Sequence, residues 1–202
     1  MTIVAVANDE QWEEVSANPG DINWVKAVNF SFGAYATADA FFILDENSAV
    51  DYATTTKPVF INSVITTLQE LHTPVNVLRI NGWHGFLQRA VWEIAGTIDN
   101  SSKMIIEKMG KKIITVKDEP GLVAAKIIAM IINEAYFAWG DDISSKAAID
   151  TAMKLGTNYP YGPFEWTAKI GINNIYNLLH KLSLSDKRYQ PAPALIAAIQ
   201  NN

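Results

Sequence analysis

The sequence predicts an α/β domain with a mostly parallel sheet, followed by an all-helical domain. Up to about residue 117, short runs rich in β-branched and aromatic residues alternate with helical patterns. Beyond that point, apolar residues recur at helical spacing, and proline and glycine separate the segments. Strands that alternate with helices are typical of βαβ units. We therefore predict two domains, residues 1–117 and residues 118–202.

The α/β domain is expected to contain strands joined by short helices. Helices are predicted over residues 9–17 and 100–109, with Asp9 suited to cap the first and Gly110 suited to end the second. The strands are predicted over residues 2–7, 23–30, 39–45, 57–64, 75–80 and 111–117.

Proline, serine and glycine mark the expected helix ends in the second domain. Proline is tolerated in the first turn, where its missing N–H has no helical partner, and glycine readily closes a helix. Pro120 and Pro163 should therefore open helices, and Ser145 should cap one over residues 146–155. The other boundaries are predicted at Gly140, Gly156, Gly171, a capping Asn173 and a rigid connector over residues 190–195.

Residues 121–139 are apolar nearly all round, but they contain Lys126, Asn133 and Glu134. Polar residues inside the segment favour a buried helix over a membrane span. A small helical domain cannot cover such a helix on every side. We therefore expect one face to be buried against a second copy, in a homodimer.

Composition excludes several classes of function. The net charge is −5 and basic residues form no long cluster, so neither nucleic acid nor a membrane is an expected partner. The absence of cysteine excludes disulfides and thiolate metal sites, and no histidine or carboxylate pair has convincing metal spacing. The N-terminal run lacks the basic start and the length of a signal peptide. We expect a cytoplasmic protein without a metal.

The second half carries a specific motif, "DTAMKLGTNYPYGPFE", over residues 150–165. With its flanks, from about residue 116 to 196, it resembles the C-terminal domain of the 3-hydroxyacyl-CoA dehydrogenases. Members of that family oxidise the 3-hydroxyl of an acyl-CoA with NAD in fatty-acid and butanoate metabolism. The resemblance implies an N-terminal NAD-binding Rossmann domain, here reduced and Rossmann-like. It also implies a helical domain that dimerises and closes the substrate cleft.

A weaker resemblance extends into the first half. Residues 79–96, "RINGWHGFLQRAVWEIAG", look like a shortened form of the segment that carries the family's catalytic His and Glu. By this resemblance His84 is the candidate base, and Glu93 the carboxylate that fixes its tautomer. Two alternatives stand beside it: Asn81 takes the histidine position in an ungapped register, or His84 only satisfies local hydrogen bonds.

Two other family positions differ. "KPVFINSVITTLQEL" resembles the strand and loop with the family's Asn-Thr-Ser-Ser segment. Asn62 and Ser63 are retained as candidate site residues, but Val64 stands where the catalytic serine should be, unless a one-residue shift places Ser63 there. In "DEPGLVAAK", Ala125 replaces the active-site asparagine of the family and offers no side-chain donor or acceptor.

The largest departure is the missing glycine loop. A dinucleotide fold needs glycines after its first strand so that the pyrophosphate can reach a helix N-terminus. Here the first glycine is Gly20, and no G-x-G-x-x-G occurs among the 11 glycines. Asp9 and Glu10 stand where that helix should begin, and their charges would repel a pyrophosphate. No cofactor-binding residue is therefore identified.

Three functional hypotheses follow. The first is a degenerate family member that has lost the usual NAD binding and binds an acyl-CoA-like ligand or a partner protein. The alternative is an active NAD-dependent 3-hydroxyacyl-CoA dehydrogenase, such as a 3-hydroxybutyryl-CoA dehydrogenase. The third is a subunit that needs another chain for its nucleotide site. Sequence alone leaves catalytic activity open.

Overall fold

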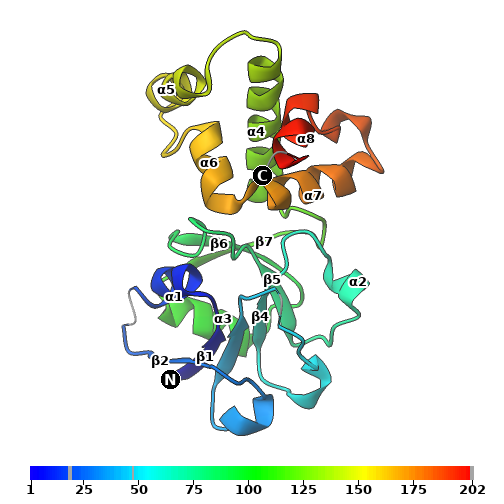
Figure 1. The fold of residues 1–202 in the computed structure, drawn as a ribbon. Coiled ribbons are helices and arrows are strands. Elements are labelled where there is room, and N and C mark those ends of the chain that lie inside the picture. The colour runs from blue at the N-terminus through cyan, green and yellow to red at the C-terminus, as the bar shows by residue number, and fades with distance from the viewer. Residues whose placement is uncertain (18–19, 47, 201–202) are drawn as a thin grey trace. The chain divides into compact units, whose positions relative to one another are not determined.

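The computed structural model describes residues 1–17, 20–46 and 48–200, which form two compact units, Met1–Leu122 and Val123–Asn202 (Figure 1). The division falls a few residues after the expected boundary at residue 117. The reason lies in hydrogen bonds that hold the intervening segment to the first unit. Gly121 N–H donates to Val64 O at 2.8 Å, and Arg79 donates to Glu119 O at 3.3 Å.

A seven-stranded sheet forms the centre of the first unit within the described residues, in the order β2-β1-β3-β4-β5-β6-β7. Every neighbouring pair is parallel except β5–β6, which is antiparallel. The predicted mostly parallel sheet is thus confirmed. The strands are β1 Thr2–Val6, β2 Asn23–Lys26, β3 Ala40–Ile43, β4 Val59–Asn62, β5 Val77–Ile80, β6 Val91–Ala95 and β7 Lys112–Thr115.

Alternating side chains along the strands build two apolar layers. Ile3 and Ala5 of β1 point into one cluster, whereas Val4 points into the other, as the period of two in a strand requires. The first layer is covered by α1 (Asp9–Ser16) and α3 (Asn100–Lys108). The opposite layer is covered by the 3₁₀ turns η1 (Phe32–Tyr35) and η2 (Tyr52–Thr54) and by α2 (Leu68–Leu71).

Two features of this unit differ from the predictions. Strand β6 was not predicted, although Trp92 and Ile94 are buried while Val91 is exposed, which is strand alternation. The cap of α1 is Asn8, so the expected capping role of Asp9 is wrong. Asn8 has extended backbone geometry and a side-chain oxygen that accepts from Gln11 N at 2.8 Å.

The second unit is helical throughout. It contains α4 Ala124–Gly140, α5 Lys146–Thr157, α6 Pro163–Ile170, α7 Ile172–Ser183, the 3₁₀ turn η3 Lys187–Tyr189 and α8 Pro193–Gln200. Helix α4 packs against α6, α7 and α8. Its buried Asn133 fixes the connector before α8, because its amide donates to Gln190 O at 2.9 Å and accepts from Ala192 N at 2.8 Å. No helix in the described ranges has both the length and the apolarity to cross a bilayer.

Some predicted helix ends in this unit are confirmed. Ser145 caps α5, with its hydroxyl accepting from Ala148 N at 3.2 Å, and Pro163 occupies the first turn of α6. Helix α4 ends at Gly140 as predicted.

Three other predicted ends are wrong. Pro120 does not open α4: the chain turns through Leu122, whose φ is 49°, and the helix begins at Ala124. Gly156 lies inside α5, which ends at left-handed Asn158. Asn173 lies inside α7, and the capping position is Gly171. Asparagine and glycine both adopt left-handed backbone, so either residue can close α5.

Candidate functional site

The topology places the candidate site at the carboxyl ends of β1 and β3. Strand β1 has β2 on one side and β3 on the other, so the strand order reverses at β1. Ligands of open α/β sheets bind outside the carboxyl ends of the strands at such a point. There Leu44 N and Asp45 N donate to Val6 O at 2.8 and 3.1 Å, and α1 begins directly after β1.

The N-terminus of α1 is closed by the chain's own side chains. Gln11 N donates to Asn8 Oδ1 at 2.8 Å, and Asn8 N donates to Gln11 Oε1 at 3.2 Å, which completes a capping box. Asp9 and Glu10 add negative charge to the first turn. A hydrogen bond and ion pair with Lys26 of β2, at 2.5 Å, lower the pKa of Asp9. The helix dipole is thus already matched by fixed carboxylates.

A buried amide network links α1 with the ends of β3, β4 and β5. Gln11 Nε2 donates to Leu44 O at 2.8 Å and to Gly82 O at 3.1 Å. Asn62 Nδ2 also donates to Leu44 O, at 3.1 Å, while Asn62 Oδ1 accepts from Gly82 N at 2.9 Å. A Cβ at Gly82 would lie 2.7 Å from the Asn62 side chain, so glycine is required here. Asn62 therefore serves as a structural link.

The loop after β5 lies on α1. Glu14 accepts from Gly85 N at 2.6 Å and from Leu87 N at 3.1 Å. His84 Nδ1 lies 3.0 Å from Glu10 Oε2, and its Nε2 lies 3.5 Å from Glu14 Oε1. Glu10 and Glu14 were missed as histidine partners, although two acids four residues apart on a helix face the same way.

The sequence had paired His84 with Glu93. Glu93 lies within β6, in register with Ile114 of β7, and its charge acts on Arg89. The His84 side chain is 27% exposed and contacts Glu10 and Glu14 of α1. The catalytic roles of His84 and Glu93 stay predictions.

Ser63 and Val64 belong to an anchor around buried Arg79. The guanidinium of Arg79 donates to Ser63 O at 2.7 Å and to Val64 O at 3.1 Å, and it forms an ion pair with Asp118. Burial lowers the pKa of Arg79, and the hydrogen bond and charge of Asp118 oppose that change. The Ser63 hydroxyl donates to Thr66 O at 2.7 Å. This cluster holds together the loop that was expected to supply a catalytic serine.

Two side-chain donors in the loop after β5 are buried without a hydrogen-bond partner among the described residues: Asn81 Nδ2 and Trp83 Nε1. Asn81 Oδ1 accepts from Trp83 N at 3.1 Å, which fixes the amide. Ala125, which stands at the family's asparagine position, is fully buried on α4 and contributes no polar atom. In the described part of the chain, no three His, Asp or Glu residues cluster in a way that could hold a metal ion.

The motif of the helical unit forms a clasp between α5 and α6. Asp150 accepts from Phe164 N at 2.8 Å, and a Cβ at Gly162 would overlap the Asp150 carboxylate. Glu165 accepts from Gly162 N at 2.9 Å and forms an ion pair with Lys154. The hydrogen bond from Lys154 lowers the pKa of Glu165, as does that from Gly162 N–H. Asp150, Gly162 and Glu165 of the motif therefore have structural roles.

The fold defines the class of protein: a Rossmann-like α/β unit followed by a helical unit. The chain superposes on the crystal structure of (S)-3-hydroxybutyryl-CoA dehydrogenase from Ralstonia eutropha with a TM-score of 0.77. That match covers 99% of this chain and 93% of the other at 18% identity, so it supports the fold alone.

Sequence comparison matches the helical unit to a family domain. Residues 121–202 match the family described as 3-hydroxyacyl-CoA dehydrogenase, C-terminal domain. The Escherichia coli 3-hydroxyadipyl-CoA dehydrogenase is 41% identical over 92 residues, which are 45% of this chain and 19% of that protein. A Clostridioides difficile 3-hydroxybutyryl-CoA dehydrogenase is 28% identical over 177 residues, covering 81% of this chain and 61% of the relative.

The chain is thus a relative of the 3-hydroxyacyl-CoA dehydrogenases, as the motif over residues 150–165 predicted, and its helical unit carries their C-terminal domain. It spans roughly a fifth to two fifths of the length of the first curated relatives that it matches.

Proposed function

We propose that this chain is a 3-hydroxyacyl-CoA dehydrogenase relative that does not hold NAD at α1 and acts as a dimeric binding protein for an acyl-CoA-like ligand. The observation that carries the proposal is the closed N-terminus of α1. The N–H groups of Asn8 and Gln11 are engaged by each other's side chains, whereas a pyrophosphate site needs free amides and glycines.

Electrostatics support the same conclusion. Asp9 and Glu10 lie in the first turn of α1, and Asp45 and Glu46 follow β3 at the same edge of the sheet. A pyrophosphate carries negative charge, so it would meet repulsion where dinucleotide folds offer a positive helix end. Lys26 forms an ion pair with Asp9, and His84 lies 3.0 Å from Glu10.

The residues around the predicted reaction centre also fit NAD chemistry poorly. Hydride transfer from an alcohol needs a base at the hydroxyl and the nicotinamide on the other side of the carbon. His84 contacts Glu10 and Glu14 of the helix that closes the dinucleotide position. Ser63 and Val64 support buried Arg79, and Ala125 has no polar side chain.

A homodimer and a CoA-ester ligand are parts of the proposal that rest on resemblance. Val123 and Ile127, at the start of α4, are 47% and 54% exposed, which favours a partner for this face. The names of the bacterial relatives refer to CoA esters of hydroxy acids.

The test is a comparison of ligands with the purified chain. Acetoacetyl-CoA should raise the melting temperature, NAD⁺ and NADH should not, and NADH should not be consumed when acetoacetyl-CoA is added. A melting temperature that rises with NADH, or steady NADH oxidation, would contradict the proposal. Size-exclusion chromatography with light scattering should give twice the monomer mass, 22.3 kDa, and a monomer would refute the dimer.

An active dehydrogenase is the second candidate, and one observation favours it. His84 and Glu10 form a histidine–carboxylate pair with Nδ1 3.0 Å from Oε2, at the carboxyl edge of the sheet. A carboxylate on one ring nitrogen can fix the tautomer of a general base. This candidate requires NADH-dependent turnover that His84→Ala abolishes and that His180→Ala leaves unchanged.

A further inference from the structure

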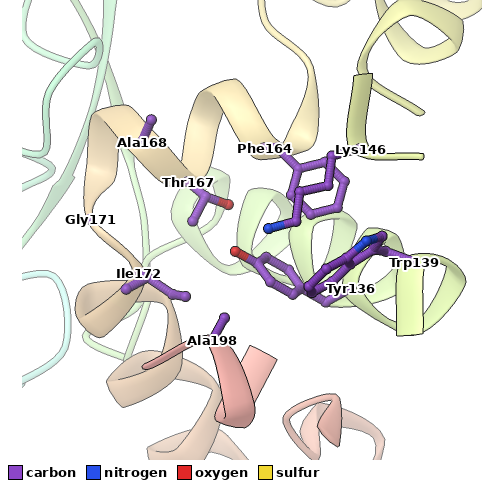
Figure 2. Close-up of a pocket in the computed structure, with 9 residues that line it drawn as sticks. All are labelled: Tyr136, Trp139, Lys146, Phe164, Thr167, Ala168, Gly171, Ile172 and Ala198. Carbon is purple, nitrogen blue, oxygen red and sulfur yellow. The ribbon is translucent and has the colours of Figure 1, made fainter. Parts of the chain in front are cut away.

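The helical unit contains a cavity of about 610 Å³ whose lining residues all belong to that unit (Figure 2). Its volume is in the range of sites that hold small organic molecules. Aromatic rings of Tyr136, Trp139 and Phe164 line one wall. Small side chains, including Ala168 and Ala198, line another and leave the space open.

A lysine lies against the aromatic wall. Lys146 Nζ is 3.9 Å from the Trp139 ring centroid, 5.4 Å from that of Phe164 and 5.7 Å from that of Tyr136. Within the described residues, its ammonium group has no carboxylate partner. The rings hold the cation in place by cation–π attraction but do not neutralise it. The cavity therefore presents a positioned positive charge that an anion can complement.

Two hydroxyls share the space with this cation. Figure 2 shows the Tyr136 hydroxyl and the Thr167 hydroxyl turned toward the Lys146 amine. Thr167 donates to Pro163 O at 2.9 Å, so its own proton is engaged. Burial raises the pKa of Tyr136, and a hydrogen bond with Thr167 opposes that rise. The Tyr136 phenol is neutral near pH 7, so Lys146 is the group that makes the cavity favour a negatively charged ligand.

We propose that this cavity binds a small organic carboxylate, with its anionic group on Lys146 and its apolar body against the aromatic wall. Lys146 is the one charged residue among those that line the pocket, which favours a ligand with one negative charge over several. Apolar walls favour a ligand that buries hydrocarbon, since that burial supplies most of the binding free energy. The proposal does not depend on the function proposed above, because the cavity lies wholly within the helical unit.

Octanoate is the probe for the test, and 1-octanol is the uncharged match. Titration of the full chain by calorimetry should show octanoate binding at least about tenfold more tightly than octanol, because a charge-assisted contact is worth about one decade of affinity. Lys146→Gln should weaken octanoate binding by about the same factor. Lys187→Gln, which removes the same charge from η3 of the same unit, should leave the affinity unchanged.

Two further measurements keep the test decisive. Ala198→Leu should narrow the cavity and weaken octanoate binding while circular dichroism stays that of the wild type. Nuclear Overhauser contacts between octanoate and the Trp139 indole of the wild type should place the ligand without any substitution. Equal affinity for octanol, unchanged binding by Lys146→Gln or no contact with Trp139 would overturn the proposal. So would a cross-linked dimer in which a second copy occupies the cavity.

Discussion

In the helical unit, residues of the family motif bond to one another, whereas at the carboxyl edge of the sheet polar side chains bond to the backbone of neighbouring strand ends. Asp150, Gly162 and Glu165 form the clasp between α5 and α6. At the sheet edge, Gln11 and Asn62 bond to backbone groups that a ligand site would leave accessible. The comparison separates residues that a fold needs from residues that a reaction needs.

The contrast has a physical basis. A packing contact such as that of Gly162 with Asp150 is required whenever the helical unit folds, whatever the chain binds. A glycine loop is required only when a pyrophosphate must approach the backbone. The structural motif can therefore persist where the loop does not, and a strong match to the motif says nothing about the loop.

The largest expected effect tests the buried anchor of the α/β unit. Arg79→Met should lower the free energy of unfolding by about 3–5 kcal/mol, because it removes the ion-pair partner of Asp118 and the donor to Ser63 O. Urea denaturation gives the value. Lys154→Met breaks the exposed pair with Glu165 and should have only a small effect. Equal losses of stability in the two variants would show that the buried anchor stabilises the fold no more than the exposed pair does.

The clasp provides the next test. Gly162→Ala should destabilise the helical unit by about 1–3 kcal/mol, since the new methyl overlaps the Asp150 carboxylate. Gly156→Ala is the matched control: it lies within α5 with open space around it, so it should stabilise by about 0.5–1 kcal/mol. Thermal unfolding measures both. The same sign for both changes would refute the clasp.

The amide network at the sheet edge should be intermediate in strength. Gln11→Ala should cost about 1–2 kcal/mol, because it breaks the capping box and leaves Gly82 O without its donor, while Asn62 still donates to Leu44 O. Gln69→Ala, at an exposed position of α2, should be nearly neutral. If the denaturation midpoints of the two variants agree, the hydrogen bonds of Gln11 do not stabilise this edge of the sheet.

The smallest effect concerns the cap of α3. A hydrogen bond from Ser102 N lowers the pKa of Asp99 below its ordinary value of 3.8. The contribution of the charged form is therefore complete above about pH 4 and is lost as the pH falls from 3.8 toward the lowered value. Asp99→Ala should cost about 1 kcal/mol at pH 7. Asp99→Asn should lose less stability and remove this acid dependence. An Asp99→Asn variant whose stability still falls below pH 4 as in the wild type would contradict the assignment.

Much of the fold follows from local pattern, and most of the site does not. The apolar runs predict six strands and the helices over residues 9–17 and 100–109, because periodicity is a local property. Strand β6 was missed because it has only five residues and Glu93 interrupts its apolar run. The partners of His84 lie on α1, far away in the sequence, and only the folded chain brings them together.

The helical unit shows the same limit. Ser145 and Pro163 could be assigned because a cap and a first-turn proline are recognised from a few residues. The aromatic cavity around Lys146 could not, because its walls come from α4, α6 and α8. No sequence pattern links its tryptophan and phenylalanine to the same lysine; only the folded chain brings the three together.

The closed N-terminus of α1 is tested most directly by titrating the full chain with NADH in a calorimeter, up to millimolar concentration. We expect no saturable heat, because the N–H groups of Asn8 and Gln11 are engaged in the capping box, and Asp9 and Glu10 repel a diphosphate. A one-to-one isotherm with a dissociation constant below 1 mM (~4 kcal/mol of binding free energy) would contradict the account.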